Sequence, residues 1–78
     1  MVTAYILINT KPGKESEILD RIKQLCRGIL ESSVVYGEYD IVLKVSVENI
    51  EDLRNLVIDN LRKIEGIERT TTLISAEL

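Results

Sequence analysis

The first segment of the chain is rich in β-branched, aromatic and other apolar residues. Val2, Ala4, Ile6 and Ile8 fall on one side, and Thr3, Tyr5 and Leu7 on the other. Successive side chains of a strand point to opposite faces, and β-branched and aromatic residues are typical of strands. Because a turn-forming Lys-Pro-Gly sequence follows at residues 11–13, the pattern predicts a strand over residues 2–9.

The hydrophobic period then changes to that of a helix. The apolar positions at helical spacing are Ile18, Leu19, Ile22, Leu25 and Cys26. Glu15 and Glu17 suit the first turn of a helix, and Arg27-Gly28 suits its end. Cys26 continues the apolar stripe, so we interpret it as a buried small hydrophobic residue rather than a reactive thiol.

The second half of the chain repeats this strand and helix order. We expect a hairpin with strands over residues 29–36 and 39–47, joined by a two-residue turn at Gly37-Glu38. Asn49 is placed to cap a second helix, and Ile67 begins a last strand that ends near Ala76. The apolar stripe of the second helix consists of Ile50, Leu53, Leu56, Val57, Leu61 and Ile64.

The predicted element order is β-α-β-β-α-β over a single domain, residues 1–78. Two right-handed crossovers joined by a hairpin give an α+β ferredoxin-like sandwich, in which a four-stranded antiparallel sheet carries both helices on one face. The other face stays uncovered, although Tyr5, Leu7 and Val42 make it apolar. We therefore predict that the protein dimerises through its sheets.

Composition removes several classes of function. The chain has no His, one Cys and a formal net charge of −3, which argues against imidazole catalysis, an ordinary zinc site and an internal disulfide. It offers no basic face for nucleic acid and no Phe or Trp for base stacking. We expect a cytoplasmic protein with no metal, no cofactor, no direct contact with nucleic acid or membrane, and no enzymatic activity. Glycine-rich phosphate motifs are absent as well.

The most unusual segment is Tyr36-Gly37-Glu38-Tyr39-Asp40, which places two aromatic residues and two carboxylates around a glycine. A turn glycine, a solvated Glu38 and two edge-covering tyrosines are the commoner interpretation of such a pattern. Alternatively, Asp40 offers a carboxylate to an ammonium group and the backbone N–H groups near Gly37 offer donors to an anion. A free α-amino acid requires this combination.

Thr70 and Thr72 form a second, weaker candidate. Alternation sends both side chains to one face of the last strand. Their hydroxyl groups are able to bind a polar ligand held against the sheet, although a β-branched strand explains the same residues.

Three segments carry a resemblance to a known family: the first strand, Gly37-Glu38-Tyr39-Asp40 followed by an alternating strand, and Gly66-Ile67 followed by Thr70 and Thr72. Together they resemble the effector domain of the Lrp/AsnC, or feast/famine, transcriptional regulators, also called the RAM domain. The resemblance extends over essentially all 78 residues. Tyr36 departs from the family pattern, which commonly has Thr before this glycine.

The resemblance implies a homodimer that assembles further into an octamer or a decamer, with an amino acid bound between dimers. It implies that Gly37, Tyr39, Asp40, Thr70 and Thr72 contribute to the ligand site. We expect Tyr36 and Glu38, which lie beside them in the sequence, to line the same site. Family members usually carry a helix-turn-helix domain before this one, whereas Met1 leads directly into the first strand. The sequence therefore looks like a stand-alone effector domain that acts through a full-length Lrp/AsnC regulator or another partner.

Two other functions remain open at the level of sequence. The chain would fit an interaction module that forms mixed oligomers without a small ligand. A small enzyme of the dimeric α+β barrel type shares the topology, but such enzymes use a polar cleft that Ile, Leu and Val fill here. Amino-acid-binding domains of the ACT type share the fold too, and the hairpin matches them less well.

Overall fold

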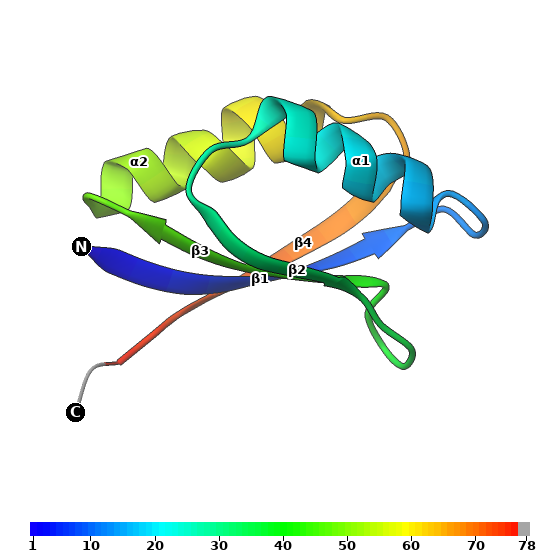
Figure 1. The fold of residues 1–78 in the computed structure, drawn as a ribbon, viewed down its shortest axis with the longest axis horizontal. Coiled ribbons are helices and arrows are strands. Elements are labelled where there is room, and N and C mark those ends of the chain that lie inside the picture. The colour runs from blue at the N-terminus through cyan, green and yellow to red at the C-terminus, as the bar shows by residue number, and fades with distance from the viewer. Residues whose placement is uncertain (77–78) are drawn as a thin grey trace.

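The computed structural model describes residues 1–76, so the last two residues of the predicted domain lie outside the described part. Its elements form two layers, with the helices on one face of a single sheet (Figure 1). They are β1 (Val2–Thr10), α1 (Glu15–Leu25), β2 (Ile29–Val34), β3 (Ile41–Val47), α2 (Ile50–Asn55), a π-helical turn η1 (Leu56–Asn60), a 3₁₀ turn η2 (Leu61–Lys63) and β4 (Ile67–Ile74).

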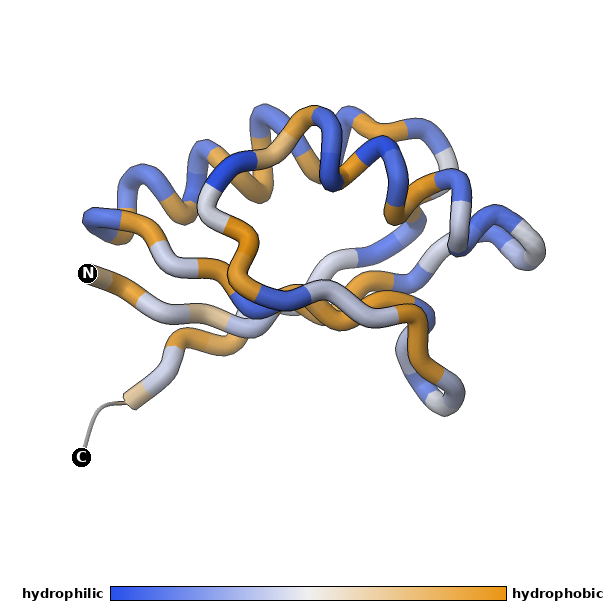
Figure 2. Tube along the Cα trace, in the orientation of Figure 1, coloured by the Kyte–Doolittle hydropathy of each residue, from blue (hydrophilic) through white to orange (hydrophobic). Residues whose placement is uncertain are grey.

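The sheet has four strands in the order β2-β3-β1-β4, and every neighbouring pair is antiparallel. This arrangement confirms the predicted ferredoxin-like fold. The core lies between sheet and helices, and the tube coloured by hydropathy shows apolar positions turned toward that space (Figure 2). Ala4, Ile6 and Ile8 of β1 are fully buried there, as their alternation predicts.

The face of the sheet away from the helices carries the apolar residues predicted to meet a second subunit. Leu7 pairs with Val42 across β1 and β3, and Tyr5 pairs with Leu73 across β1 and β4. Tyr5 is 38% exposed and Leu73 is 50% exposed. The Lys44 ammonium lies over the Tyr5 ring, 6.0 Å from its centroid. This face is therefore a half-exposed apolar surface with one cation beside its aromatic ring.

The predicted two-residue turn of the hairpin is wrong. β2 ends at Val34 and β3 begins at Ile41, so residues 35–40 form a longer loop. The Val35 N–H donates to the carbonyl of Asp40 (2.8 Å), while the Asp40 N–H donates to the carbonyl of Ile8 on β1 (2.9 Å). The bond between Val35 and Asp40 closes the hairpin, and four residues, 36–39, lie between these partners instead of two.

The second helix is only partly as predicted. The Asn49 side chain caps it by accepting from the Asp52 N–H (2.8 Å), as expected. The regular α-helix ends at Asn55, however, and a π-helical turn follows. Leu56 and Leu61 are both buried and five positions apart. That spacing falls off one α-helical face, whereas the i→i+5 period of a π-turn brings both side chains to the core.

The first helix ends earlier than predicted, at Leu25, and Cys26 has extended backbone. Cys26 is buried, and this burial raises the pKa of its thiol. Both observations agree with its interpretation as a core residue. Gly28 lies against β3 instead of capping the helix: a Cβ there would be 2.7 Å from the carbonyl oxygen of Ser46.

Candidate functional site

An open cavity of about 570 Å³ lies where the hairpin loop meets β1 and β4. Its lining residues are Asn9 from β1, Glu38 and Tyr39 from the loop, and Glu68 and Arg69 from β4. Two of these, Glu38 and Tyr39, belong to the segment that the sequence singles out. The cavity joins segments far apart in the chain around a small set of charged and polar side chains.

The sheet register explains why these segments meet. Asn9 pairs with Arg69, and the β1–β4 register shifts between Asn9 and Thr10. The Asn9 side-chain amide donates to the carbonyl of Glu38 (2.6 Å). A bulge re-aims side chains at a strand end, and here it coincides with the residue that ties the hairpin loop to the sheet.

Asp40 fixes the same loop from the other side. Its Oδ2 accepts from the Thr10 backbone N–H at 2.8 Å, and the Thr10 hydroxyl lies 3.5 Å from the same oxygen. Thr10 is 5% exposed, so the carboxylate satisfies a buried donor that the bulged strand leaves without a ladder partner. Within residues 1–76, hydrogen bonds to this carboxylate involve only Oδ2.

The charges of the cavity suit a ligand that carries one positive and one negative group. It contains one guanidinium, from Arg69, and two carboxylates, from Glu38 and Glu68. Among the described residues none of the three forms an ion pair within 4.0 Å. A guanidinium can bind a carboxylate through two parallel hydrogen bonds, and a carboxylate can accept from an ammonium group. The set can therefore bind an ammonium and a carboxylate of one small molecule.

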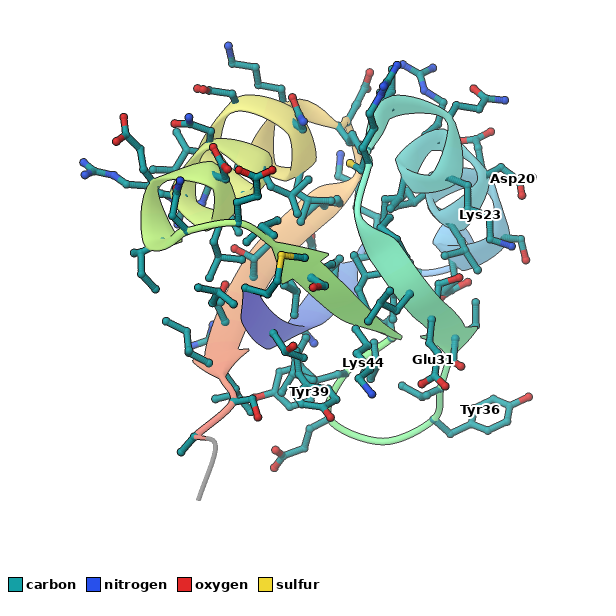
Figure 3. The ribbon with its side chains drawn as sticks, turned by 60° about the vertical axis from the view of Figure 1, so that its left-hand side comes forward. Asp20, Lys23, Glu31, Tyr36, Tyr39 and Lys44 are labelled. Atoms are coloured by element: carbon teal, nitrogen blue, oxygen red, sulfur yellow. The ribbon has the colours of Figure 1, made fainter. Side chains whose placement is uncertain are left out.

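The other predicted hairpin residues lie beside the cavity rather than in it. Tyr36 is fully exposed and its ring points away from the body of the domain, whereas Tyr39 lies back toward the sheet (Figure 3). Gly37 has a φ of 122°, a region that favours glycine, and nothing lies within 4 Å of a Cβ built there. The space beside the Gly37 Cα is thus free of other side chains.

Thr70 and Thr72 share one face of β4, as alternation predicts, but the structure does not bring them to the hairpin cavity. Thr70 pairs with Ile8 and Thr72 with Ile6. Paired residues share a face, so both threonines lie on the helix side of the sheet. Thr70 borders a different cavity of about 340 Å³.

Sequence reasoning missed Asn9, Glu68 and Arg69. Polar residues at the end of one strand and the start of another are ordinary in a sequence. Their meeting depends on the β1–β4 register and on the bulge at Asn9 and Thr10. The only signal that the sequence offers for this part of the site is the pair of opposite charges, Glu68 and Arg69, directly before Thr70.

The charged cavity at the hairpin end of this βαββαβ sandwich suits a domain that binds a small ligand, whereas the fold itself hosts many functions. The sequence model of one family, described as the Lrp/AsnC ligand binding domain, matches residues 3–77. The chain belongs to this family. The relatives that it matches are transcriptional regulators, and the family is one of ligand-binding domains rather than enzymes.

Two curated relatives show the extent of the match. An uncharacterized HTH-type transcriptional regulator of Pyrococcus horikoshii is 38% identical over 76 residues, covering 94% of this chain and 50% of the relative. The HTH-type transcriptional regulator FL11 of Pyrococcus furiosus is 38% identical over 73 residues, covering 94% of this chain and 47% of the relative. The chain thus spans about half the length of the curated relatives it matches.

Solved structures support the fold. The crystal structure of FFRP-DM1 has a TM-score of 0.90 at 38% identity and covers 97% of this chain and 100% of its own. AsnC of E. coli has a TM-score of 0.90 at 26% identity, covering 99% of this chain and 52% of its own. A regulator of Neisseria meningitidis at 16% identity, with a TM-score of 0.85, shares the fold over 97% of this chain and 50% of its own.

Two further findings concern other kinds of site. Within residues 1–76, no helix has the length and apolar character needed to cross a membrane. The same residues contain no group of three or more Cys, Asp or Glu side chains arranged to hold a metal ion.

Proposed function

We propose that this chain is an amino-acid-sensing, oligomerising regulatory domain. The observation that carries the proposal is that Arg69, Glu38 and Glu68 line the same cavity. Within the described residues, none of the three charges is neutralised by an ion pair. Arg69 takes the α-carboxylate of the ligand and a carboxylate takes its ammonium group. Tyr39 supplies the apolar wall.

The predicted hairpin residues extend this site. Asp40 has one carboxylate oxygen, Oδ1, outside its bonds to Thr10, and in the proposal this oxygen faces the ammonium group. The open backbone near Gly37 binds part of the carboxylate. Support also comes from the regulator of Neisseria meningitidis, which shares the fold and was solved as a complex with L-Met.

Completion of the site requires more than one subunit. Tyr36 points into solvent, and Thr70 and Thr72 lie on the helix side of the sheet, away from the hairpin cavity of their own chain. These residues reach a shared ligand only if the hairpin of one subunit lies against β4 of another. Ligand binding then favours one assembly over another, because only the assembled state contains the whole site.

The basic unit of the assembly is a homodimer formed by two sheets packed face to face. Tyr5, Leu7 and Val42 lie on the uncovered face, joined by Leu73. Covering half-exposed apolar side chains gains about 25 cal/mol for each Å² removed from water, and small domains benefit most from such association. Dimers then assemble into an octamer or a decamer.

The route to transcription is co-assembly. The curated relatives are HTH-type regulators about twice as long as the matched segment. In the proposal this chain joins a full-length Lrp/AsnC regulator in the cytoplasm and changes the size of its assembly. A small amino acid that binds both proteins would set the composition of the mixed oligomer.

Light scattering after size-exclusion chromatography tests the proposal. A thermal-shift screen of the twenty amino acids first identifies a ligand; at 100 times its dissociation constant the ligand stabilises each site by about 2.7 kcal/mol. The measured mass is expected to change when that amino acid is added. If no amino acid shifts the melting temperature and the mass is constant, the chain is an interaction module without a small ligand, and the proposal fails.

A further inference from the structure

A second cavity, on the helix side of the domain, concentrates positive charge. It has a volume of about 530 Å³ and lies between the β1–α1 loop, α1 and the segment that leads from η2 into β4. Its cationic lining residues are Lys11, Lys14, Arg21 and Lys63. They make up four of the ten Lys and Arg residues of a chain whose net charge is −3. Because the protein as a whole is acidic, this cluster of positive charges does not follow from its overall composition.

Helical spacing places part of the lining on one side of α1. Lys14, Ile18 and Arg21 are separated by intervals of four and three residues, which puts them on one face of the helix. Ile18 is buried and forms an apolar part of the wall together with Ile64. The cavity therefore combines a cationic rim with an apolar floor.

Gly66 brings the remaining cations to this face. Its φ is 101°, a region that favours glycine, and a Cβ there would lie 2.7 Å from Cδ1 of Ile18, so the loop passes close to α1. The carbonyl of Gly66 accepts from the Lys11 N–H at 2.9 Å. These contacts hold the Lys11 and Lys63 segments beside α1, where the connection into β4 passes in Figure 1.

The cations of the cavity are only partly neutralised. Two acidic residues, Glu17 and Glu65, line the same cavity. The one ion pair found in residues 1–76 joins Lys14 Nζ to Glu17 Oε2 at 3.9 Å, between two exposed side chains. Such an exposed pair contributes little. Arg21, Lys11 and Lys63 form no ion pair within the described part of the chain, and two positive charges remain in excess.

We propose that this cavity binds an organic phosphate with at least two negative charges. Its volume falls in the range of small-molecule sites, about 300–1,000 Å³, and so admits an organic group beside the phosphates. Arg21 binds phosphate oxygens through its planar guanidinium, the lysines act as point charges, and the aliphatic stems of these exposed side chains contact the organic part. The cavity shares no lining residue with the hairpin cavity, so the two proposals can fail separately.

Titration calorimetry of the full chain tests this site with three probes: adenosine diphosphate, fructose bisphosphate and inorganic pyrophosphate. The test variant is the Arg21→Gln, Lys63→Gln double substitution, which removes two exposed cations of the cavity. The matched control is Lys23→Gln with Arg54→Gln, which removes the same charge from α1 and α2 outside the cavity. Lys23 projects from the outer side of α1 (Figure 3).

We expect at least one organic diphosphate to bind more tightly than pyrophosphate, and the affinity to fall as salt is raised. The test variant should weaken binding by about tenfold or more, because each lost cation removes charge-assisted hydrogen bonds to the phosphate groups. The control should change it by less than about twofold. The proposal is overturned if neither organic probe binds at millimolar concentration, if pyrophosphate alone binds, or if the control loses as much affinity as the test variant.

Discussion

Replacing Asp40 separates its structural contribution from its proposed contact with a ligand. Asp40→Ala leaves the Thr10 N–H without its acceptor at 2.8 Å, at a residue only 5% exposed. A buried donor left unsatisfied costs about 1–3 kcal/mol. For a domain of this length each kcal/mol lowers the melting temperature by about 4–8 °C. The variant should therefore unfold measurably earlier than the parent protein.

Asp40→Asn provides the matched comparison, because its amide oxygen can still accept from Thr10 while the charge is gone. We expect it to retain most of the stability that Asp40→Ala loses, yet to bind an amino acid more weakly if Asp40 faces the ammonium group. Urea unfolding at one fixed protomer concentration measures the first effect. Equal stability of Asp40→Ala and the parent protein would refute the structural reasoning, as would an equal loss in both variants.

Three further substitutions or treatments test other parts of the fold. Gly66 has a φ of 101° and a Cβ there would lie 2.7 Å from Ile18, whereas Gly13 has a φ of 81° and open space around it. Gly66→Ala should therefore lower the free energy of unfolding more than Gly13→Ala does, and the midpoints of urea unfolding compare the two. Burial raises the pKa of Cys26, so alkylation should be slow until the protein unfolds. The thiol ionises near 9.0 in the unfolded chain and at a higher pH in the folded protein, so the free energy of unfolding should decline as the pH rises above 9.0. Circular dichroism measures this decline. Asn49→Ala removes a helix cap and should cost about 1 kcal/mol, while Asn49→Asp should cost much less.

Periodicity predicts the layers of this domain because burial selects residues by their position in the period. The alternation around Ile6 places it in the core, and the apolar stripe of α1 places Ile22 there. The hairpin turn was predicted wrongly: the bond between Val35 and Asp40 closes a four-residue connection. The Asp40 carboxylate is bonded to Thr10, a contact between residues 30 positions apart that no local pattern contains. The sequence conceals the π-turn at Leu56, because the four-residue interval from Val57 to Leu61 fits an ordinary helical stripe and hides the five-residue interval between the buried Leu56 and Leu61.

The sequence predicts only part of the candidate site. Glu38 and Tyr39 are visible in the sequence because aromatic residues and carboxylates are crowded around Gly37. Arg69 reaches the same cavity only through its pairing with Asn9 at the β-bulge. A strand register depends on which residues of both strands are buried together, so the guanidinium of the site could be located only in three dimensions.

Binding of an amino acid at the hairpin cavity is the central claim, and calorimetric titration with the amino acid that gives the largest thermal shift tests it most directly. Three proteins are compared: the parent chain, Arg69→Gln, which removes the guanidinium of the cavity, and Arg54→Gln, which removes one from the exposed side of α2. We predict saturable binding to the parent chain and to Arg54→Gln, with affinity about tenfold or more lower in Arg69→Gln. Equal affinity of all three proteins, or no binding by the parent chain, would contradict the account.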